Sequence, residues 1–121
     1  MRVCLLIGLG GFFGAVLRYL LSLIPVSEKL GFPVITLLIN ILGALLIGVL
    51  AGITLKFPAL DGEWMAFLQI GVCGGFTTFS TFALETTLLF GAEKMGAGLL
   101  YIGLSLALGL GAVWLGRAVV M

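Results

Sequence analysis

The sequence predicts an all-α membrane protein with four transmembrane helices, and three observations lead to this fold class. Of the 121 residues, 62% are hydrophobic and only 9% are charged, against about 45–50% and about 25% in soluble domains. The mean hydropathy is +1.35. The apolar residues form four runs, each long enough for a helix to cross a bilayer core, which needs about 20 residues. The chain is therefore expected to be a single transmembrane domain, residues 1–121, and not an enzyme.

Short polar segments separate the four runs. The first run ends at Pro25, and Pro33 suits the first turn of the next helix because it has no N–H to leave unpaired. Trp64 begins the third run, where its amphipathic ring suits the membrane interface. The predicted spans are Val3–Ile24, Pro33–Leu55, Trp64–Phe90 and Met95–Val119.

Small residues recur at intervals of four within the first two spans. Gly10 and Gly14 share one face of the first span, and Gly48 and Gly52 share one face of the second. Such rows let helix backbones approach closely. Helix packing explains most of these glycines without any further function.

The third span is too long for a simple crossing. As a continuous helix, Trp64–Phe90 would extend about 40 Å at about 1.5 Å per residue. Tilt can absorb the excess, and so can a break at Gly74-Gly75, where glycine tolerates unusual backbone dihedrals. Non-helical backbone at membrane depth is tolerated only where it is buried in protein or lines a water-filled path. We expect a broken third helix beside such a path.

Polar side chains gather around the predicted break, in the segment Gly71–Glu85 with the sequence GVCGGFTTFSTFALE. One alternative is that the hydroxyls bond back to helix carbonyls and the rings only pack. So many polar groups in one apolar span favour a polar path instead. After its glycines, the segment supplies four hydroxyls, two of its phenyl rings and one carboxylate, from Thr77, Thr78, Ser80, Thr81, Phe79, Phe82 and Glu85.

The residue types leave the sign of a transported ion open. Hydroxyls and the Asn40 amide donate hydrogen bonds, and the positive edge of a phenyl ring can face an anion. Arg18, inside the first apolar run, would raise the concentration of anions at a pore mouth. A negative charge on Glu85 would repel an anion and so favours a cation, unless Glu85 is protonated or tied to a hydroxyl.

The basic residues are evenly divided between the two sides of a four-span chain. This balance gives the positive-inside rule no asymmetry to act on. A chain with no orientation signal can insert both ways, and two inverted copies would form a pair related by a two-fold axis in the membrane plane. We expect an antiparallel, dual-topology homodimer in the lipid bilayer, and no nucleic-acid partner. The two groups are Arg2, Lys56 and Arg117 on one side and Arg18, Lys29 and Lys94 on the other.

Three segments together resemble the Fluc/CrcB fluoride channel family. They are GVCGGFTTFSTFALE, GGFFGAVLRY at Gly10–Tyr19 and LLINILGALLIG at Leu37–Gly48, in three of the four spans. The resemblance implies a fluoride-selective channel of a bacterial or archaeal inner membrane. Such a channel exports cytoplasmic fluoride by passive electrodiffusion through two antiparallel pores per homodimer.

The resemblance also implies roles for the residues of the polar segment. Phe79 and Phe82 match the paired phenylalanines whose ring edges line the fluoride path. Asn40 matches the second-span asparagine that donates into it. Ser80 and Thr81 match hydroxyls of a polar track.

Further roles follow from the same resemblance. Arg18 matches a vestibule arginine, Glu85 looks like the glutamate beyond the second phenylalanine, and Tyr101 is similar to the fourth-span tyrosine near it. A structural sodium ion is implied at the dimer centre. Its ligands would be backbone carbonyls of the broken third span, here those of Gly74 and Thr77.

Two other classes of protein remain as alternatives. A dual-topology small multidrug-type transporter has a similar length, but it would be expected to carry an essential carboxylate in its first span, where this chain has Arg18 and no acid. A non-transporting membrane assembly subunit would need no polar interior. The polar segment counts against that reading.

Overall fold

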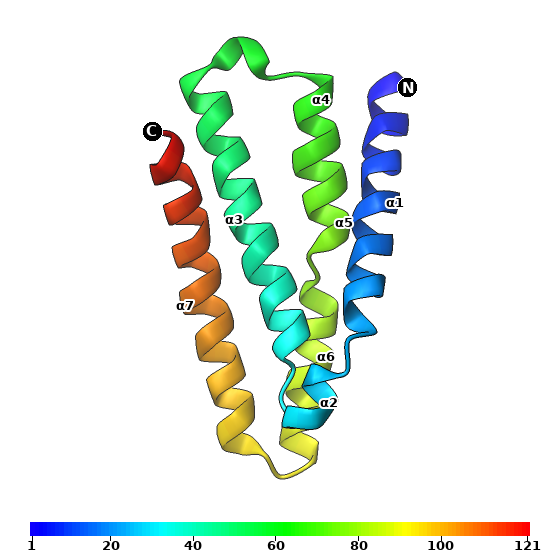
Figure 1. Cartoon of the computed structure of the whole chain (residues 1–121), viewed down its shortest axis with the longest axis vertical. Helices are drawn as coiled ribbons and strands as arrows, with labels where there is room; N and C mark the ends of the chain where they lie inside the picture. The colour runs from blue at the N-terminus through cyan, green and yellow to red at the C-terminus, as the bar shows by residue number, and fades with distance from the viewer.

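Four helical columns run side by side in the computed structural model, which describes all residues 1–121 (Figure 1). There are no strands. Four helical segments are long and apolar enough to cross a membrane, Arg2–Ser22, Val34–Lys56, Glu63–Gly91 and Met95–Val120. The predicted all-α class and the four spans are confirmed, and each span boundary lies within two residues of its prediction.

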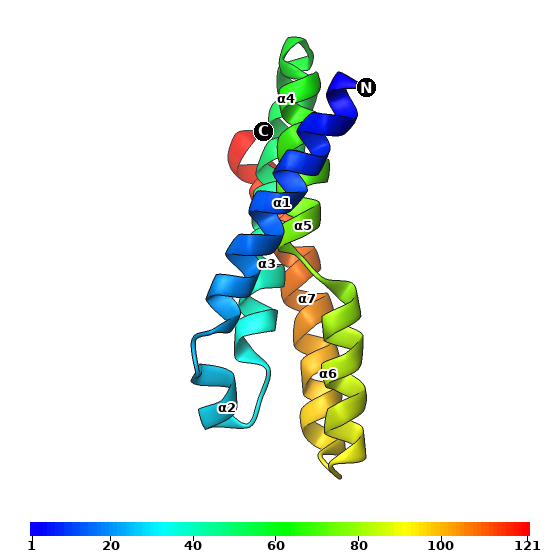
Figure 2. The ribbon, with the colours of Figure 1, turned by 90° about the vertical axis from the view of Figure 1, so that its right-hand side faces the viewer.

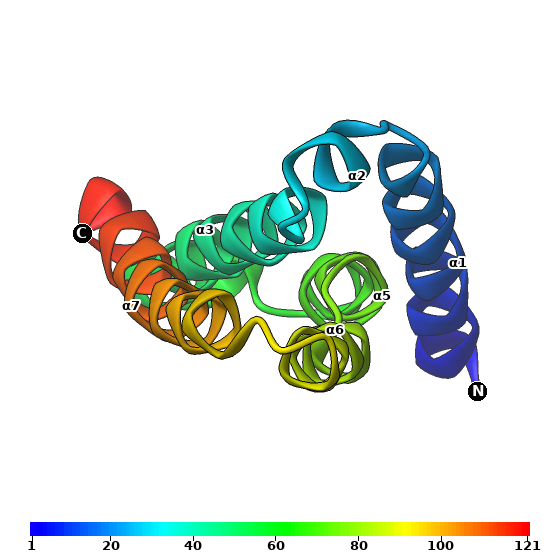
Figure 3. The same cartoon turned by 90° about the horizontal axis from the view of Figure 1, so that it is seen from below.

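Three columns are single helices, and the third is built from shorter pieces. The single helices are α1 (Arg2–Ser22), α3 (Val34–Lys56) and α7 (Met95–Val120). The third column consists of α4 (Glu63–Ala66), the π-helix η2 (Phe67–Cys73), α5 (Gly74–Phe76) and α6 (Phe79–Gly91). Seen from below, this column lies between α1 on one side and α3 with α7 on the other (Figure 3).

The connections are short and partly helical. A five-residue helix, α2 (Val26–Leu30), fills the first connection, which was predicted only as a polar segment. Gly31 ends it in the left-handed region, at φ 63°, a conformation that glycine adopts without a Cβ clash. A 3-10 turn, η1 (Pro58–Leu60), follows α3. Both chain ends lie at one end of the bundle, and α2 and the turn between α6 and α7 lie at the other (Figure 1).

The predicted glycine rows do bring helices together. A Cβ on Gly48 would strike the backbone of Val113 in α7, and one on Gly52 would crowd Arg117 and Val120. The partner helix contributes its own small residue at this crossing, since a Cβ on Gly116 would strike the Leu45 carbonyl. This packing fixes α3 and α7 as a rigid pair.

The third column is broken, but not where the glycine pair predicted. Gly74 is helical, with φ −63° and ψ −38°, whereas Thr77 (φ −81°, ψ 159°) and Thr78 (φ −150°, ψ 118°) are extended. The break therefore lies three residues beyond the predicted site, at Thr77-Thr78. One long-range and one local contact explain this position, because the Thr78 backbone pairs with Asn40 of α3 and the Thr78 side chain caps α6.

Candidate functional site

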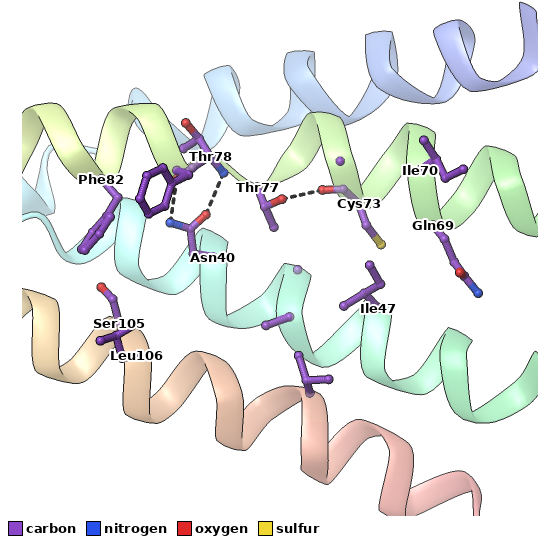
Figure 4. A pocket seen from close by; sticks show the side chains of 15 residues that line it. Asn40, Ile47, Gln69, Ile70, Cys73, Thr77, Thr78, Phe82, Ser105 and Leu106 are labelled. Atoms are coloured by element: carbon purple, nitrogen blue, oxygen red, sulfur yellow. Dashed lines mark hydrogen bonds between the residues drawn. The ribbon is translucent and has the colours of Figure 1, made fainter. Parts of the chain in front are cut away.

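A cavity of about 620 Å³ lies against the break, between the third column, α3 and α7. Figure 4 shows that it extends from Gln69 at one end, past Thr77 and Asn40, to Phe82 and Ser105 at the other. Most of its lining is apolar, and its polar groups gather beside the break. The break and the predicted polar segment thus face one shared space.

Asn40 takes the place of the helical hydrogen bonds that are lost at the break. Its Nδ2 donates to the Thr78 carbonyl at 3.0 Å, and the Thr78 N–H donates to its Oδ1 at 2.8 Å. Nδ2 carries two hydrogens, so one remains for a further acceptor. Asn40 is on the cavity wall, as its predicted role requires.

Two backbone carbonyls at the break lose the donors that a continuous helix would give them. The usual donor to the Gly74 carbonyl is the Thr78 N–H, which donates to Asn40 instead. The usual donor to the Thr77 carbonyl is the Thr81 N–H, which donates to the Thr78 hydroxyl at 3.1 Å. Gly74 and Thr77 both line the cavity.

Carbonyl oxygens without their usual donors suit a hard cation. No group of three or more His, Cys, Asp or Glu side chains could hold a metal ion. A cation at the break would therefore be bound by neutral backbone oxygens. Gly74 and Thr77 are the two residues that the resemblance to the fluoride channels implied.

Aromatic rings continue from the cavity toward α7. Phe79 is 79% exposed in the single subunit, and its ring centroid lies 5.6 Å from that of Phe82. Phe82 meets Tyr101 nearly edge to face, at 5.0 Å and 74°. Phe79 and Phe82 both line the cavity.

The Glu85 carboxylate accepts one hydroxyl hydrogen on each oxygen. Thr36 donates to Oε1 at 2.7 Å and the fully buried Tyr101 donates to Oε2 at 2.8 Å. The sequence allowed Glu85 beside an anion path only if it is protonated or tied to a hydroxyl, and here it is tied to two. Thr36 was not predicted, although its place one turn before Asn40 on the same face of α3 was a usable signal.

Glu85 belongs to a second cavity, of about 310 Å³, near the loop end of the bundle. Lys94 and Glu28 also line it. Tyr101 connects the two spaces, because it contacts Phe82 of the first cavity and Glu85 of the second. The polar and aromatic side chains form one continuous series from the break to this end.

The hydroxyls of Ser80 and Thr81, which the resemblance places in a polar track, lie around Thr78 rather than on the cavity wall. The Thr78 hydroxyl donates to that of Thr81 at 3.0 Å and lies 3.3 Å from that of Ser80. Ser80 and Thr81 are absent from the lining of both cavities. Ser105 does line the first cavity, and its buried hydroxyl has no hydrogen-bond partner. It was missed, although it follows Tyr101 by four residues on one face of α7.

Arg18 lies apart from this series. It contributes to neither cavity, and its Nε donates to the Gly75 carbonyl at 3.2 Å, on the side of the break that faces α1. The structure thus brings together Asn40, Phe79, Phe82, Glu85 and Tyr101 along the series and leaves Arg18 outside it.

The fold and the site define a four-span membrane protein with a broken third helix and a cavity whose few polar groups gather at the break. Residues 5–117 match the model of the family described as CrcB-like protein, Camphor Resistance (CrcB). The chain belongs to this family.

Curated relatives cover nearly the whole chain and bear the name fluoride-specific ion channel FluC. The protein of Methanococcus maripaludis is 50% identical over 119 residues, which cover 97% of this chain and 94% of the relative. That of Thermus thermophilus is 47% identical over 113 residues, 93% of this chain and 90% of the relative. The protein of Ruminiclostridium cellulolyticum is 46% identical over 112 residues, which cover 92% of this chain and 86% of the relative.

Proposed function

We propose that the chain is a fluoride-selective channel that exports cytoplasmic fluoride by passive electrodiffusion. The proposal rests on the continuous series of amide, ring edges and hydroxyls beside the break, in a chain whose relatives are named fluoride-specific ion channels. No acid lies in α1, where a small multidrug-type transporter would be expected to carry one.

Fluoride holds its water strongly, so a conducting path must replace that water with donors and still bind weakly enough to release the ion. The free hydrogen on Asn40 Nδ2 and the unpaired Ser105 hydroxyl are the available donors at the first cavity. The edges of Phe79 and Phe82 then provide weaker, positively polarised contacts. Alternating strong and weak contacts favour passage over trapping.

Beyond Phe82, the ion reaches hydroxyls that Glu85 holds. The Thr36 and Tyr101 hydroxyls both donate to the carboxylate, and these two bonds disperse its negative charge where the anion passes. Glu85 in turn holds both side chains in place beside the path toward the second cavity. Ser80 and Thr81 support the break through Thr78 in this scheme.

An antiparallel, dual-topology homodimer would complete the site. Polar groups and non-helical backbone do not face lipid, yet the four helices leave the cavity at the break uncovered and Phe79 79% exposed. A second, inverted copy of the chain covers this face and gives two antiparallel pores.

The charge distribution supports insertion in both orientations. Arg18 bonds to the middle of the third column, so it does not count as a loop charge. The remaining basic residues are nearly balanced, which leaves a weak orientation signal. Those at the end that holds both termini are Arg2, Lys56 and Arg117, and those at the other end are Lys29 and Lys94.

A structural sodium ion at the dimer axis would use the carbonyls at the break. Gly74 and Thr77 each present an acceptor without its usual donor on the face that the second copy would cover. Two copies supply four such oxygens, and oxygen ligands suit a hard cation. The ion would satisfy buried acceptors and would not be transported.

The proposed location is the inner membrane of a bacterium or archaeon. Hydrofluoric acid enters cells as a neutral molecule and dissociates at cytoplasmic pH. A passive path lets the membrane potential, negative inside, drive the trapped anion out. Export therefore needs no energy source beyond that potential.

Liposome reconstitution tests this function. Vesicles loaded with potassium fluoride and given valinomycin should release fluoride electrogenically, as recorded with a fluoride electrode, and chloride should stay inside. Proton-coupled exchange of organic cations would instead indicate a transporter. If the correctly assembled protein transports neither fluoride nor organic cations, it would instead belong to the class of non-transporting assembly subunits.

A further inference from the structure

Arg18 ends a row of three residues on the face of α1 that packs against the third column. Figure 2 shows that α1 lies beside α4 and α5 and parts from α6 beyond the break. A Cβ on Gly10 would strike the backbone at Phe67, and one on Gly14 would strike the backbone at Val72 and Phe76. The first two residues of the row are therefore glycines where the backbones of α1 and the third column touch. The third residue, Arg18, has a long side chain and lies where α5 ends.

The Arg18 guanidinium has a backbone partner and no acidic one. Its Nε donates to the Gly75 carbonyl at 3.2 Å, and the two residues are 57 apart in the chain. The ion pair that the structure contains joins Arg2 to Glu63, at the far end of α1. A cation beside the last carbonyls of a helix is favourable, because those carbonyls carry partial negative charge.

The carbonyls at the break divide between two faces. Gly75 faces α1, where a Cβ on it would strike the backbone of Gly11. Gly74 and Thr77 line the cavity on the other side. Arg18 thus satisfies the acceptor that a cation in the cavity could not reach.

We propose that Arg18 is a positioning residue that fixes the end of α5 and thereby aims the Gly74 and Thr77 carbonyls into the cavity. The donor at the Nε position carries this role, and the positive charge is secondary. The inference rests on the proposed sodium site, but it concerns the backbone at the break and can be measured without ion flux.

Two substitutions separate the donor from the charge. In Arg18→Gln, the amide nitrogen is as many bonds from Cα as Arg Nε, so the donor is kept and the charge is lost. In Arg18→Met, a chain of similar shape has neither. Arg18→Lys keeps the charge but moves the donor one atom farther out. Leu17→Met, on the exposed neighbour, is the matched control.

Amide hydrogen exchange of Thr77 and Thr78 in the reconstituted protein is the readout, since both amides are bonded at the break. Arg18→Met should speed their exchange about tenfold, as expected for one lost charge-assisted bond, and Arg18→Gln should stay within about twofold of the unmodified chain. Arg18→Lys should exchange faster than Arg18→Gln, a comparison that holds even if Arg18→Met does not fold.

Hydrogen exchange measured across a sodium titration adds a second readout, which a general loss of structural stability would not change. The sodium concentration that half-protects these amides should rise about tenfold in Arg18→Met and remain near normal in Arg18→Gln. The inference is overturned if Arg18→Met exchanges normally, or if Arg18→Lys is protected and Arg18→Gln is not. Normal exchange behaviour in a chain that passes no fluoride would instead refute the proposed function alone.

Discussion

Asn40 and Thr78, which are 38 residues apart in the chain, exchange two hydrogen bonds of 3.0 and 2.8 Å across the broken helix. The side-chain amide pairs with the Thr78 backbone as a neighbouring strand would. This pairing holds the break open and leaves one amide hydrogen free beside the cavity. Asn40 therefore has a structural task at the break, beside the ion-binding role proposed for its free hydrogen.

Asn40→Asp should abolish fluoride flux while the protein still assembles. The carboxylate can accept from the Thr78 N–H, but it cannot donate to the Thr78 carbonyl, and its charge repels an anion. Efflux from liposomes and size-exclusion chromatography measure the two parts of this prediction. Flux at the normal rate would show that Asn40 is not in the ion path.

Phe82→Ile should also abolish flux, because it removes the ring that bridges Phe79 and Tyr101. Isoleucine has no positively polarised edge to offer an anion. Phe13→Ile on the exposed face of α1 is the matched control, since Phe13 is 52% exposed and outside both cavities. Equal flux in the two variants would refute the ring-edge contact.

Tyr101→Phe should lower the free energy of unfolding by about 1.5–3 kcal/mol, the range for a hydrogen bond to a charged group. The ring stays packed, but the Glu85 carboxylate loses the donor on Oε2. Thermal unfolding in detergent measures the change. Tyr19→Phe makes the same chemical change at an exposed position and should have little effect. If both substitutions lower the free energy of unfolding equally, the hydrogen bond to Glu85 does not explain the effect of Tyr101→Phe.

Replacing sodium with N-methylglucamine should reduce both flux and the dimer fraction, because the Gly74 and Thr77 carbonyls would lose their cation. Thr77→Val should retain this sodium dependence, since the Thr77 hydroxyl donates to the Cys73 carbonyl and the proposed ligand is the backbone carbonyl, which the substitution keeps. Sodium dependence that disappears in Thr77→Val would point to the hydroxyl as the ligand. A dimer indifferent to sodium would argue against the site.

Reporter fusions at the C-terminus should be active on both sides of the membrane. The nearly balanced basic residues leave orientation open, so half of the copies should insert each way. Adding two lysines after Val120 should bias insertion toward one orientation and reduce flux with it. Activity on one side alone in the unmodified chain would end the dual-topology proposal.

The four spans and their packing rows could be predicted because they depend on local composition. Apolar length sets each span, and a glycine at every fourth position marks a backbone contact, as Gly10, Gly14 and Gly48 demonstrate. These signals are contained within one helix. They do not need to identify a distant partner.

The position of the break could not be predicted from glycine alone. Gly74 and Gly75 are the most permissive residues of the third column, yet both remain helical. The helix breaks at Thr77 and Thr78 because Asn40 competes for the Thr78 backbone, and that contact is not local. Thr36 and Ser105 were missed for a related reason. Thr36 donates to Glu85 of α6, and Ser105 lines a cavity that other columns help to enclose.

The π-helix η2 and the extended pair at the break change the length of the third column in opposite directions. Each turn of η2 holds more residues than an α-helical turn, so seven residues, Phe67–Cys73, advance less along the axis than they would in α5 or α6. The extended pair after Phe76 has the opposite effect, because an extended residue advances about 3.3 Å and an α-helical one about 1.5 Å. The two irregular stretches therefore offset each other, and the 29-residue crossing keeps about the length of a continuous helix, which tilt must absorb.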